Sequence, residues 1–246
     1  MTQMNNSKLH PRVLRIAEAL LPRFLLNCLD PVQTLIESEV QWAASQMLSG
    51  QMVLDAGAGE GRHRRCFHRG TYLGLDSMVG DPRWDYAGLD ICGNLESLPL
   101  RNASVDYILC MVVLEHTRVP GQALKEFARV LKPGGTLMLV VPFLWEEHQA
   151  PHDYFRFTRY GVQALFEPLP FRIHMLNPIG GFFWLCARRC VNLLGFFQRG
   201  WRWFFFLLLA PLFGILFPAI LYLMDPLDPS KNFTLGYRVR AVREKD

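Results

Sequence analysis

The segment Val53–Gly61 restricts the fold of this chain more than any other part of its sequence. It reads Val-Leu-Asp-Ala-Gly-Ala-Gly-Glu-Gly, so that an apolar run ends in Asp55 and glycines follow at alternate positions. This order predicts a buried parallel strand, a tight loop and the start of a helix. Glycines let a backbone approach a ligand closely, and free amides at a helix N-terminus favour an anion.

The spacing of the glycines separates two kinds of nucleotide site. A dinucleotide-binding fingerprint would place its third glycine at position 62, where this chain has Arg62. The G-x-G-x-G spacing of Gly57, Gly59 and Gly61 instead resembles motif I of the class I S-adenosylmethionine (SAM) methyltransferases. That resemblance implies that the loop holds the methionine end of SAM, with the carboxylate of SAM near the helix start.

Alternating apolar patterns along the chain predict an α/β fold. Expected strands cover residues 51–55, 71–76, 105–111, 136–141, 171–175 and 233–241. Expected helices cover residues 31–48, 61–69, 121–131 and 158–166, the first with Asp30 as its N-cap. The fold class implied by this order and by the resemblance is a doubly wound, mostly parallel seven-stranded sheet, Rossmann-like, with a hydrophobic helical insertion before the last strand.

Further motifs in the expected order resemble the "type 11" group of class I methyltransferases, over about residues 40–177 and 233–243. Asp76 ends the second strand, where the family uses an acid to accept hydrogen bonds from the ribose hydroxyls. Gly93–Pro99 resembles the adenine-binding G-D-x-x-x-L-P segment, with Asn94 in place of the Asp, and a plain turn Asn is the alternative. The resemblance implies these cofactor contacts: Asp55, Gly57, Gly59, Gly61, Asp76, Asn94, Leu95, Cys110 and Met111.

Two histidine-containing stretches follow expected strands. Leu114-Glu115-His116 resembles the family's post-strand L-E-H, and His152–Thr158 resembles its H-D-Y-x-R-[FY]-T. Doubly wound sheets bind ligands at the carboxyl ends of their strands. His116 and His152 are therefore candidates for the base that removes a proton from the methyl acceptor, and Asp153, Tyr154 and Arg156 are candidates for substrate contact. Helix capping and core packing are the alternative role of the second stretch.

Composition limits the partners and the metals. The net charge of the 246-residue chain is +4 and no dense Lys/Arg tract is present, so nucleic acid is not an expected partner. The six cysteines show no C-x-x-C spacing and no secretory signal is recognisable, which predicts free thiols in a reducing cytoplasm. His63, Cys66 and His68 lack a fourth ligand, and we expect no metal.

The segment Trp203–Met224 carries no charged residue and is long enough to span a bilayer. An insertion that leaves and re-enters one sheet cannot cross a membrane once, and Arg188 and Arg189 make a second crossing costly. We therefore expect residues 178–231 to form a hydrophobic hairpin, in-plane or re-entrant, that attaches the protein through residues 180–224 to the cytoplasmic face of a membrane. A buried core helix is the alternative.

Together these patterns predict a SAM-dependent methyltransferase with a lipophilic or membrane-linked acceptor. The expected domains are a lead-in at residues 1–30, a SAM-binding domain at 31–177 plus 232–246, and the hairpin insertion at 178–231. Two alternatives stay open: a non-catalytic, membrane-attached SAM-binding or scaffold protein, and a nicotinamide-dependent (NAD) oxidoreductase. The sequence specifies neither the acceptor nor the oligomeric state.

Overall fold

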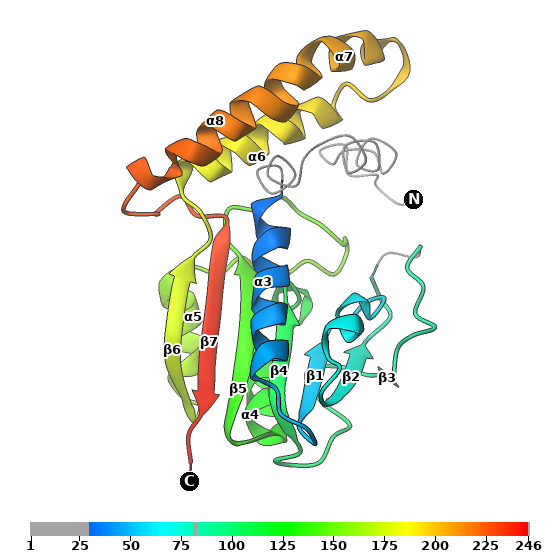
Figure 1. Cartoon of the computed structure of the whole chain (residues 1–246), viewed down its shortest axis with the longest axis vertical. Helices are drawn as coiled ribbons and strands as arrows, with labels where there is room; N and C mark the ends of the chain where they lie inside the picture. Colours follow the sequence, from blue (N-terminus) through cyan, green and yellow to red (C-terminus); the bar gives the residue numbers. More distant parts are fainter. Residues whose placement is uncertain (1–29, 81–82, 246) are drawn as a thin grey trace. The chain divides into compact units, whose positions relative to one another are not determined.

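A seven-stranded sheet forms the centre of the domain that carries the glycine loop (Figure 1). The computed structural model describes residues 30–80 and 83–245, so the lead-in expected at residues 1–30 lies outside the described residues except for Asp30. The strand order is β3-β2-β1-β4-β5-β7-β6. The strands are β1 (Met52–Ala56), β2 (Thr71–Asp76), β3 (Ile91–Cys92), β4 (Val105–Met111), β5 (Leu131–Pro142), β6 (Phe171–Pro178) and β7 (Gly236–Arg243).

The sheet is mostly parallel, as predicted. Strand β1 pairs in parallel with β2 and β4, β2 with β3, and β4 with β5, whereas β7 runs antiparallel to β5. From β1 the chain builds the sheet outward in one direction through β2 and β3, and it then returns to place β4 on the other side of β1. The sheet therefore changes its winding direction between β1 and β4. Such points are where open α/β sheets bind their ligands.

Helices cover both faces of this sheet. In Figure 1, α3 (Pro31–Gln46) lies in front of it, and α4 (Pro120–Val130) and α5 (Arg159–Phe166) lie behind. Because side chains alternate along a strand, Tyr237 and Val239 of β7 join the core with α4 and α5. Arg238 and Arg240 point the other way and both pair with the buried Glu39 of α3.

Two expected element boundaries are confirmed by capping contacts. The amide of Gln33 donates to the Asp30 carboxylate, 3.1 Å away, at the start of α3. The amide of Gly161 donates to the Thr158 hydroxyl, 3.0 Å away, at the start of α5. Strand β7 begins at Gly236, three residues later than the alternation predicted, and β5 begins at Leu131, before the Lys132–Gly135 turn motif.

The helix expected at residues 61–69 is wrong. The chain forms only a five-residue 3₁₀ helix, η1 (Arg62–Cys66), with no buried residue. Its sequence has four basic side chains in succession and no apolar stripe, so nothing holds an α-helix against the sheet. His63 reaches instead to Asp55, and Arg64 donates to the Gly88 carbonyl.

The chain divides into two compact units, and residues 178–235 fall in a different unit from the sheet. They form α6 (Phe182–Gly195), η3 (Gly200–Arg202), α7 (Trp203–Pro211), the π-helical turn η4 (Leu212–Leu216), α8 (Phe217–Met224) and η5 (Asp225–Leu227). The predicted hydrophobic helical insertion before the last strand is therefore confirmed as part of the fold. The π-helical turn lies between Pro211 and Pro218, where the missing amides interrupt regular hydrogen bonding.

The helices of the insertion form an antiparallel hairpin. The rings of Trp184 in α6 and Tyr222 in α8 stack with centroids 4.9 Å apart, and Leu194 of α6 lies against Gly214. At the base of the hairpin the Thr234 hydroxyl bonds both the amide and the carbonyl of Ile179. The two ends of the insertion are thus tied together.

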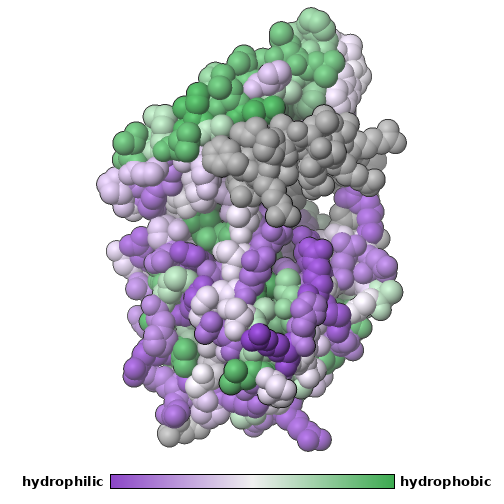
Figure 2. Space-filling model, in the orientation of Figure 1, coloured by the Kyte–Doolittle hydropathy of each residue, from purple (hydrophilic) through white to green (hydrophobic). Residues whose placement is uncertain are grey.

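Most of the hairpin surface is apolar. Residues Gly200–Leu227 form 28 continuous helical residues that are long and apolar enough to cross a membrane, and only 11% of their most apolar window is buried. Figure 2 shows most of this layer in green, with a few pale or purple residues among the hydrophobic ones. Large side chains exposed there include Trp201, Phe204, Leu207, Leu208, Ile220, Leu223 and Leu227. The alternative of a buried core helix does not fit this exposure.

Candidate functional site

The loop after β1 has the tight backbone that its glycines predict. Gly57, Gly59 and Gly61 all have positive φ angles, of 91°, 54° and 68°. A Cβ on Gly57 would lie 2.4 Å from a methyl carbon of Val113, so that only glycine fits between β1 and the residues after β4. The predicted tight loop is therefore present at the point where the sheet changes winding direction.

Four amides of the loop donate to acceptors within the protein. The amides of Gly57 and Ala58 both donate to the Leu75 carbonyl, at 2.8 and 3.0 Å. The Gly59 amide donates to the Asp76 carboxylate, and the Gly61 amide to the Ala58 carbonyl, both at 2.9 Å. These four donors are therefore engaged, and the segment that follows is the short 3₁₀ helix η1 and not an α-helix.

Two buried carboxylates stand at the ends of adjacent strands. Asp76 ends β2, and its Oδ2 and Oδ1 accept from the amides of Gly59 (2.9 Å) and Met78 (2.7 Å). Each oxygen of a carboxylate has a second acceptor position. Asp55 of β1 accepts from the Tyr72 hydroxyl (2.6 Å) and lies 2.9 Å from His63 Nδ1, both through Oδ2. Burial, reinforced by the Asp55 charge, raises the pKa of Tyr72 far above its ordinary value, so the phenol remains a donor.

The predicted adenine segment follows the two-residue strand β3. Leu95 is buried, whereas Asn94 is exposed and its side-chain oxygen accepts from the Glu96 amide at 2.9 Å. This is an Asx turn, the plain role that was the alternative for Asn94. The turn is fixed to α4, because Glu126 accepts from the Leu98 amide at 2.8 Å.

Strand β4 delivers Cys110 and Met111 to the same edge of the sheet. Cys110 is fully buried, and burial followed by the charges of Glu115 and Asp55 raises the pKa of its thiol. Met111 is partly exposed. The next residue, Val112, has a φ angle of 60°, which is rare for a β-branched side chain. Its amide donates to the Val140 carbonyl at 2.8 Å, and this bond holds the strained turn that brings Val113 to Gly57.

Trp84 lies beside the glycine loop, a position that no motif or periodicity in the sequence predicts. A Cβ on Gly59 would lie 3.3 Å from the Trp84 ring, and one on Gly80 only 2.6 Å from it. The ring therefore lies against the glycine loop. The region between β2 and β3 has no periodic pattern, so its placement depends on tertiary contacts.

The two histidine-containing stretches come together, as expected for loops after neighbouring parallel strands. His116 lies in η2 (Leu114–His116), and its Nδ1 is 2.7 Å from the His152 carbonyl oxygen. The Tyr154 amide donates to the Glu115 carbonyl at 2.9 Å. Burial lowers the pKa of His116 despite the opposing charge of Glu115, which keeps the imidazole neutral. The Nδ1 of His152 lies 3.1 Å from the Tyr154 hydroxyl.

Asp153 and Arg156 pair with each other. The guanidinium makes two bonds to the carboxylate, of 2.6 and 2.7 Å, and also donates to the Glu146 carbonyl. Burial alone would raise the pKa of Asp153, but the bonds from Arg156 and from the His148 amide outweigh it and lower that pKa. Arg118 lies over the Tyr154 ring, 5.0 Å from its centroid. These contacts fix the loop, and the roles proposed for Asp153, Tyr154 and Arg156 toward a substrate remain predictions.

Glu115 and His148 complete the buried centre of this loop pair, and sequence reasoning assigned neither of them a role. Glu115 is fully buried, and its Oε1 lies 3.3 Å from His148 Nε2 and 3.7 Å from His116 Nε2. In the sequence, Glu115 is the central residue of the L-E-H motif, and His148 lies four residues before the H-D-Y motif. Nothing in that spacing indicates that the side chains converge.

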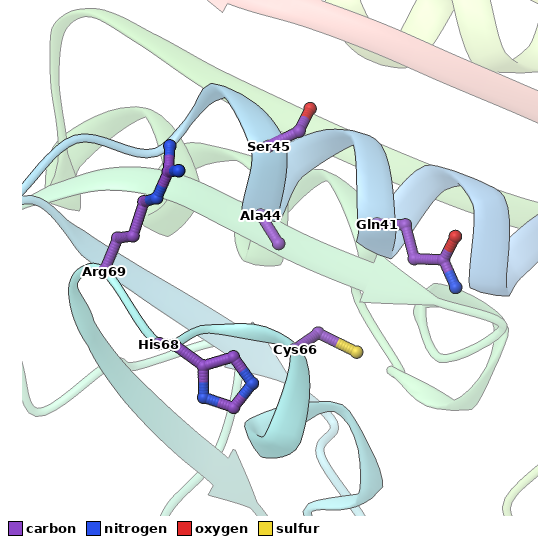
Figure 3. Close-up of a pocket in the computed structure, with 6 residues that line it drawn as sticks. All are labelled: Gln41, Ala44, Ser45, Cys66, His68 and Arg69. Carbon is purple, nitrogen blue, oxygen red and sulfur yellow. The ribbon is translucent and has the colours of Figure 1, made fainter.

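A shallow surface cavity of about 400 Å³ lies away from these residues (Figure 3). It is lined by Gln41, Ala44 and Ser45 of α3 and by Cys66, His68 and Arg69. Cys66 and His68 thus face this cavity, while His63 contacts Asp55. The three residues considered as a metal cluster in the sequence are divided between two environments.

Comparison with known proteins gives a match for part of the sheet domain. Residues 54–139 match the family Methyltransf_11, described as a methyltransferase domain. A probable S-adenosylmethionine-dependent methyltransferase of Mycolicibacterium smegmatis is 38% identical over 100 residues, which are 38% of this chain and 39% of that protein. The chain therefore covers about two fifths of that relative's length.

Solved structures show the same fold at low sequence identity. The [4+2]-cyclase SpnF has a TM-score of 0.54 and 17% identity, with 85% of this chain and 81% of that chain covered. The putative methyltransferase in complex with the Trm112 methyltransferase activator of Haloferax volcanii has a TM-score of 0.52 and 20% identity, covering 85% and 92%. Because one neighbour is a cyclase, the fold does not fix the reaction. Residues 54–139 of this chain thus match a methyltransferase-domain family and lie within a Rossmann-like α/β fold that the chain shares with solved methyltransferase structures.

Proposed function

We propose that this protein is a SAM-dependent methyltransferase that works at a membrane surface on a lipophilic or membrane-linked acceptor. One observation carries the proposal: the glycine loop after β1 lies directly beside the Asp76 carboxylate at the switch point of a methyltransferase-type sheet. The membrane part of the proposal rests on the separate observation of the exposed apolar hairpin.

The residues at the switch point fit the chemistry of SAM. Asp76 has one acceptor position left on each oxygen, which matches the two vicinal hydroxyls of a ribose. Asp55 Oδ1 accepts no hydrogen bond from the described residues and is available to an ammonium group. The carboxylate of the methionine tail would have to find its donors outside the amides of Gly57, Ala58, Gly59 and Gly61.

SAM supplies an activated methyl group, which passes to an oxygen, nitrogen or carbon nucleophile by in-line displacement while the sulfonium leaves as a thioether. The task of the protein is to hold the donor and the acceptor in line, and such positioning can contribute about 7–11 kcal/mol. The paired loops that carry His116 and His152 flank the carboxyl ends of β4 and β5 and would form the acceptor side of the site. Either imidazole could take the proton of a hydroxyl acceptor.

The insertion supports a membrane-surface location rather than a pair of crossings. Helix α6 has 14 residues, which is about 21 Å at 1.5 Å per residue and shorter than a hydrocarbon core of about 30 Å. Both ends of the insertion join adjacent strands of one sheet, β6 and β7. A single crossing by Gly200–Leu227 would leave those ends on opposite sides, so an in-plane or re-entrant hairpin is the consistent arrangement.

Calorimetry and a transfer assay test the activity. We expect purified protein to bind SAM and not NAD, which separates the methyltransferase from an oxidoreductase. We also expect label from [methyl-³H]SAM to enter a membrane lipid extract, and the labelled product would identify the acceptor. SAM binding without transfer to any extract would favour the non-catalytic scaffold, and no SAM binding by folded protein would refute the proposal.

Fractionation tests the location. We expect the protein to sediment with membranes, and a wash with alkaline carbonate to distinguish peripheral from integral attachment. Recovery of the full chain in the soluble fraction without salt or detergent would contradict the membrane part and leave the methyltransferase part intact.

A further inference from the structure

The carboxylate of Glu115 is the least satisfied polar group among the described residues of the sheet domain. Its side chain has no exposed surface, and neither of its oxygens accepts a hydrogen bond. A buried carboxylate without a partner is costly, because desolvation favours its neutral form unless a cation or a donor is present. Glu115 is an ionisable residue among neighbours such as Leu114 and Cys110, which are also fully buried. The position therefore calls for a compensating positive charge.

Two imidazoles present their Nε2 atoms to this carboxylate. His148 Nε2 and His116 Nε2 lie 3.3 and 3.7 Å from Glu115 Oε1, and both Nε2 atoms are buried without a hydrogen bond. The three ligand atoms all lie within 4.8 Å of one another. They come from two loops, η2 and the segment between β5 and α5.

The opposite nitrogen of each ring determines which tautomer is present. His116 Nδ1 lies 2.7 Å from the His152 carbonyl oxygen, and His148 Nδ1 lies 3.2 Å from the Glu146 carbonyl oxygen. A carbonyl oxygen only accepts, so each Nδ1 carries a proton, and in a neutral imidazole the Nε2 atom then presents a lone pair. Three acceptor groups therefore converge on one buried point. Without a cation they repel one another.

We propose that Glu115, His116 and His148 bind a divalent transition-metal ion of the Zn²⁺ class. Zn²⁺ takes nitrogen and oxygen ligands at about 2.0–2.2 Å in a tetrahedron, which places neighbouring ligand atoms about 3.3–3.6 Å apart. The Glu115–His148 separation of 3.3 Å meets this value and the Glu115–His116 separation of 3.7 Å lies just above it, whereas the two imidazoles, within 4.8 Å of each other, would have to draw closer on binding the ion. Two imidazoles and one carboxylate favour Zn²⁺ over Mg²⁺ or Ca²⁺, which prefer oxygen.

The surroundings match those of metal-bound histidines. Such histidines donate their other ring N–H to a carbonyl or a carboxylate, which fixes their orientation. His116 uses the His152 carbonyl in this way, and His148 has the Glu146 carbonyl and the Asp153 carboxylate, 3.5 Å away. Asp153 is held in turn by two bonds from Arg156. The Asp153–Arg156 pair of the H-D-Y-x-R stretch would thus orient the metal ligand His148.

The ion would pin η2 to the segment between β5 and α5, next to the carboxyl ends of β4 and β5. Three protein ligands leave a fourth position in a tetrahedral site. A bound ion also occupies the Nε2 lone pair of His116, which leaves His152 as the base among the two predicted candidates. The metal site is independent of SAM, and it stands or falls separately from the proposed function.

Metal analysis of the full-length protein tests the inference. After dialysis against a weak chelator and loading with ZnCl₂, mass spectrometry of the metal content should give about one Zn²⁺ per chain, and millimolar MgCl₂ should not displace it. Glu115→Gln and His148→Asn should each weaken Zn²⁺ binding at least about 100-fold, since each removes a ligand. The matched controls His152→Asn and His63→Asn should bind Zn²⁺ as the original protein does.

X-ray absorption at the zinc edge of the unmodified protein keeps the test independent of how the variants fold. Nitrogen and oxygen neighbours at about 2.0–2.1 Å without sulfur are expected, whereas sulfur at about 2.3 Å would place the metal at a cysteine and overturn the inference. Failure to bind Zn²⁺ by protein that still binds SAM would also overturn it. Unchanged Zn²⁺ affinity in Glu115→Gln would have the same consequence.

Discussion

Gly57 and Val113 are in direct contact at the edge of the sheet, and a Cβ on Gly57 would lie 2.4 Å from Val113 Cγ1. The contact couples the loop after β1 to the strained turn after β4, where Val112 has a positive φ angle. Both halves of the predicted cofactor site therefore depend on one steric fit.

The first prediction concerns this fit. Gly57→Ala should weaken SAM binding at least about 10-fold, because the methyl group displaces Val113 in addition to straining a φ of 91°. Gly50→Ala is the matched control, since Gly50 has a φ of 82° but no atom within 4 Å of its Cβ position, and it should cost only about 1 kcal/mol of folding free energy. Adding Val113→Ala to Gly57→Ala should restore part of the SAM affinity measured by calorimetry. No recovery in the double variant would refute the steric explanation.

The second prediction concerns Asp76. Asp76→Asn replaces one of two acceptor oxygens with a donor and should weaken SAM binding by about 10- to 100-fold, the equivalent of losing one charged hydrogen bond of about 1.5–3 kcal/mol. Glu244→Gln, a change in an exposed pair with Arg172, should leave the calorimetric Kd unchanged. Equal SAM affinity in Asp76→Asn would remove the ribose assignment.

The third prediction concerns Trp84. Its ring lies against Gly59 and Gly80, so a ligand that occupies the loop must change the environment of the indole. Tryptophan fluorescence should therefore change on addition of SAM, and Trp84→Phe should abolish most of that change. Trp42 of α3, whose ring lies under the Arg240 guanidinium, provides the control. Trp42→Phe should keep the fluorescence change on addition of SAM. A full signal in Trp84→Phe would place the ligand elsewhere.

The fourth prediction concerns the pH dependence of stability. Hydrogen bonds from Arg129, supported by the Leu98 amide, lower the pKa of Glu126 although burial opposes them. A carboxyl whose folded pKa is depressed stabilises the protein above its unfolded pKa, and this contribution is lost as the pH falls through the folded pKa. Glu126→Gln should therefore lower the free energy of unfolding by about 1 kcal/mol at pH 7.

The difference between Glu126→Gln and the unmodified protein should shrink in urea titrations as the pH falls below the ordinary carboxyl range, and it should disappear only once the pH is below the lowered folded pKa of Glu126, where the carboxyl is neutral in both states. Glu244→Gln, whose exposed pair is worth little, should change stability by a few tenths of a kcal/mol at any pH. A pH-independent difference for Glu126→Gln would show that packing, and not charge, is responsible.

The fifth prediction concerns the hairpin. The exposed side chains Phe204, Leu207 and Leu208 would each contribute about 1.5–3 kcal/mol on entering a bilayer. Replacing all three with Ser should reduce binding to lipid vesicles at least about 100-fold, without changing the affinity for SAM. Leu48→Ser, at a leucine that is 66% exposed in the sheet domain, is the matched control and should bind vesicles normally. Unchanged vesicle binding in the triple variant would contradict attachment through these helices.

The local pattern of the sequence was sufficient for most of the fold. Strand β4 matches its predicted range Val105–Met111, and β2 matches Thr71–Asp76, because continuous apolar runs have one stable solution inside a covered parallel sheet. The seven-stranded class I fold and the helical insertion followed from the same patterns and from the motif order. The helix at 61–69 failed because the basic run that follows Gly61 has no apolar face to pack.

Only the tertiary structure decided which side chains share a site. The sequence by itself placed Gly57, Asp76 and His116 at strand ends, since strand periodicity fixes where a strand stops. It could not show that Glu115 and His148, 33 positions apart, meet within 3.3 Å, or that Trp84 lies on the glycine loop. Those contacts depend on how loops fold across the sheet edge, and loops have no periodicity from which to predict them.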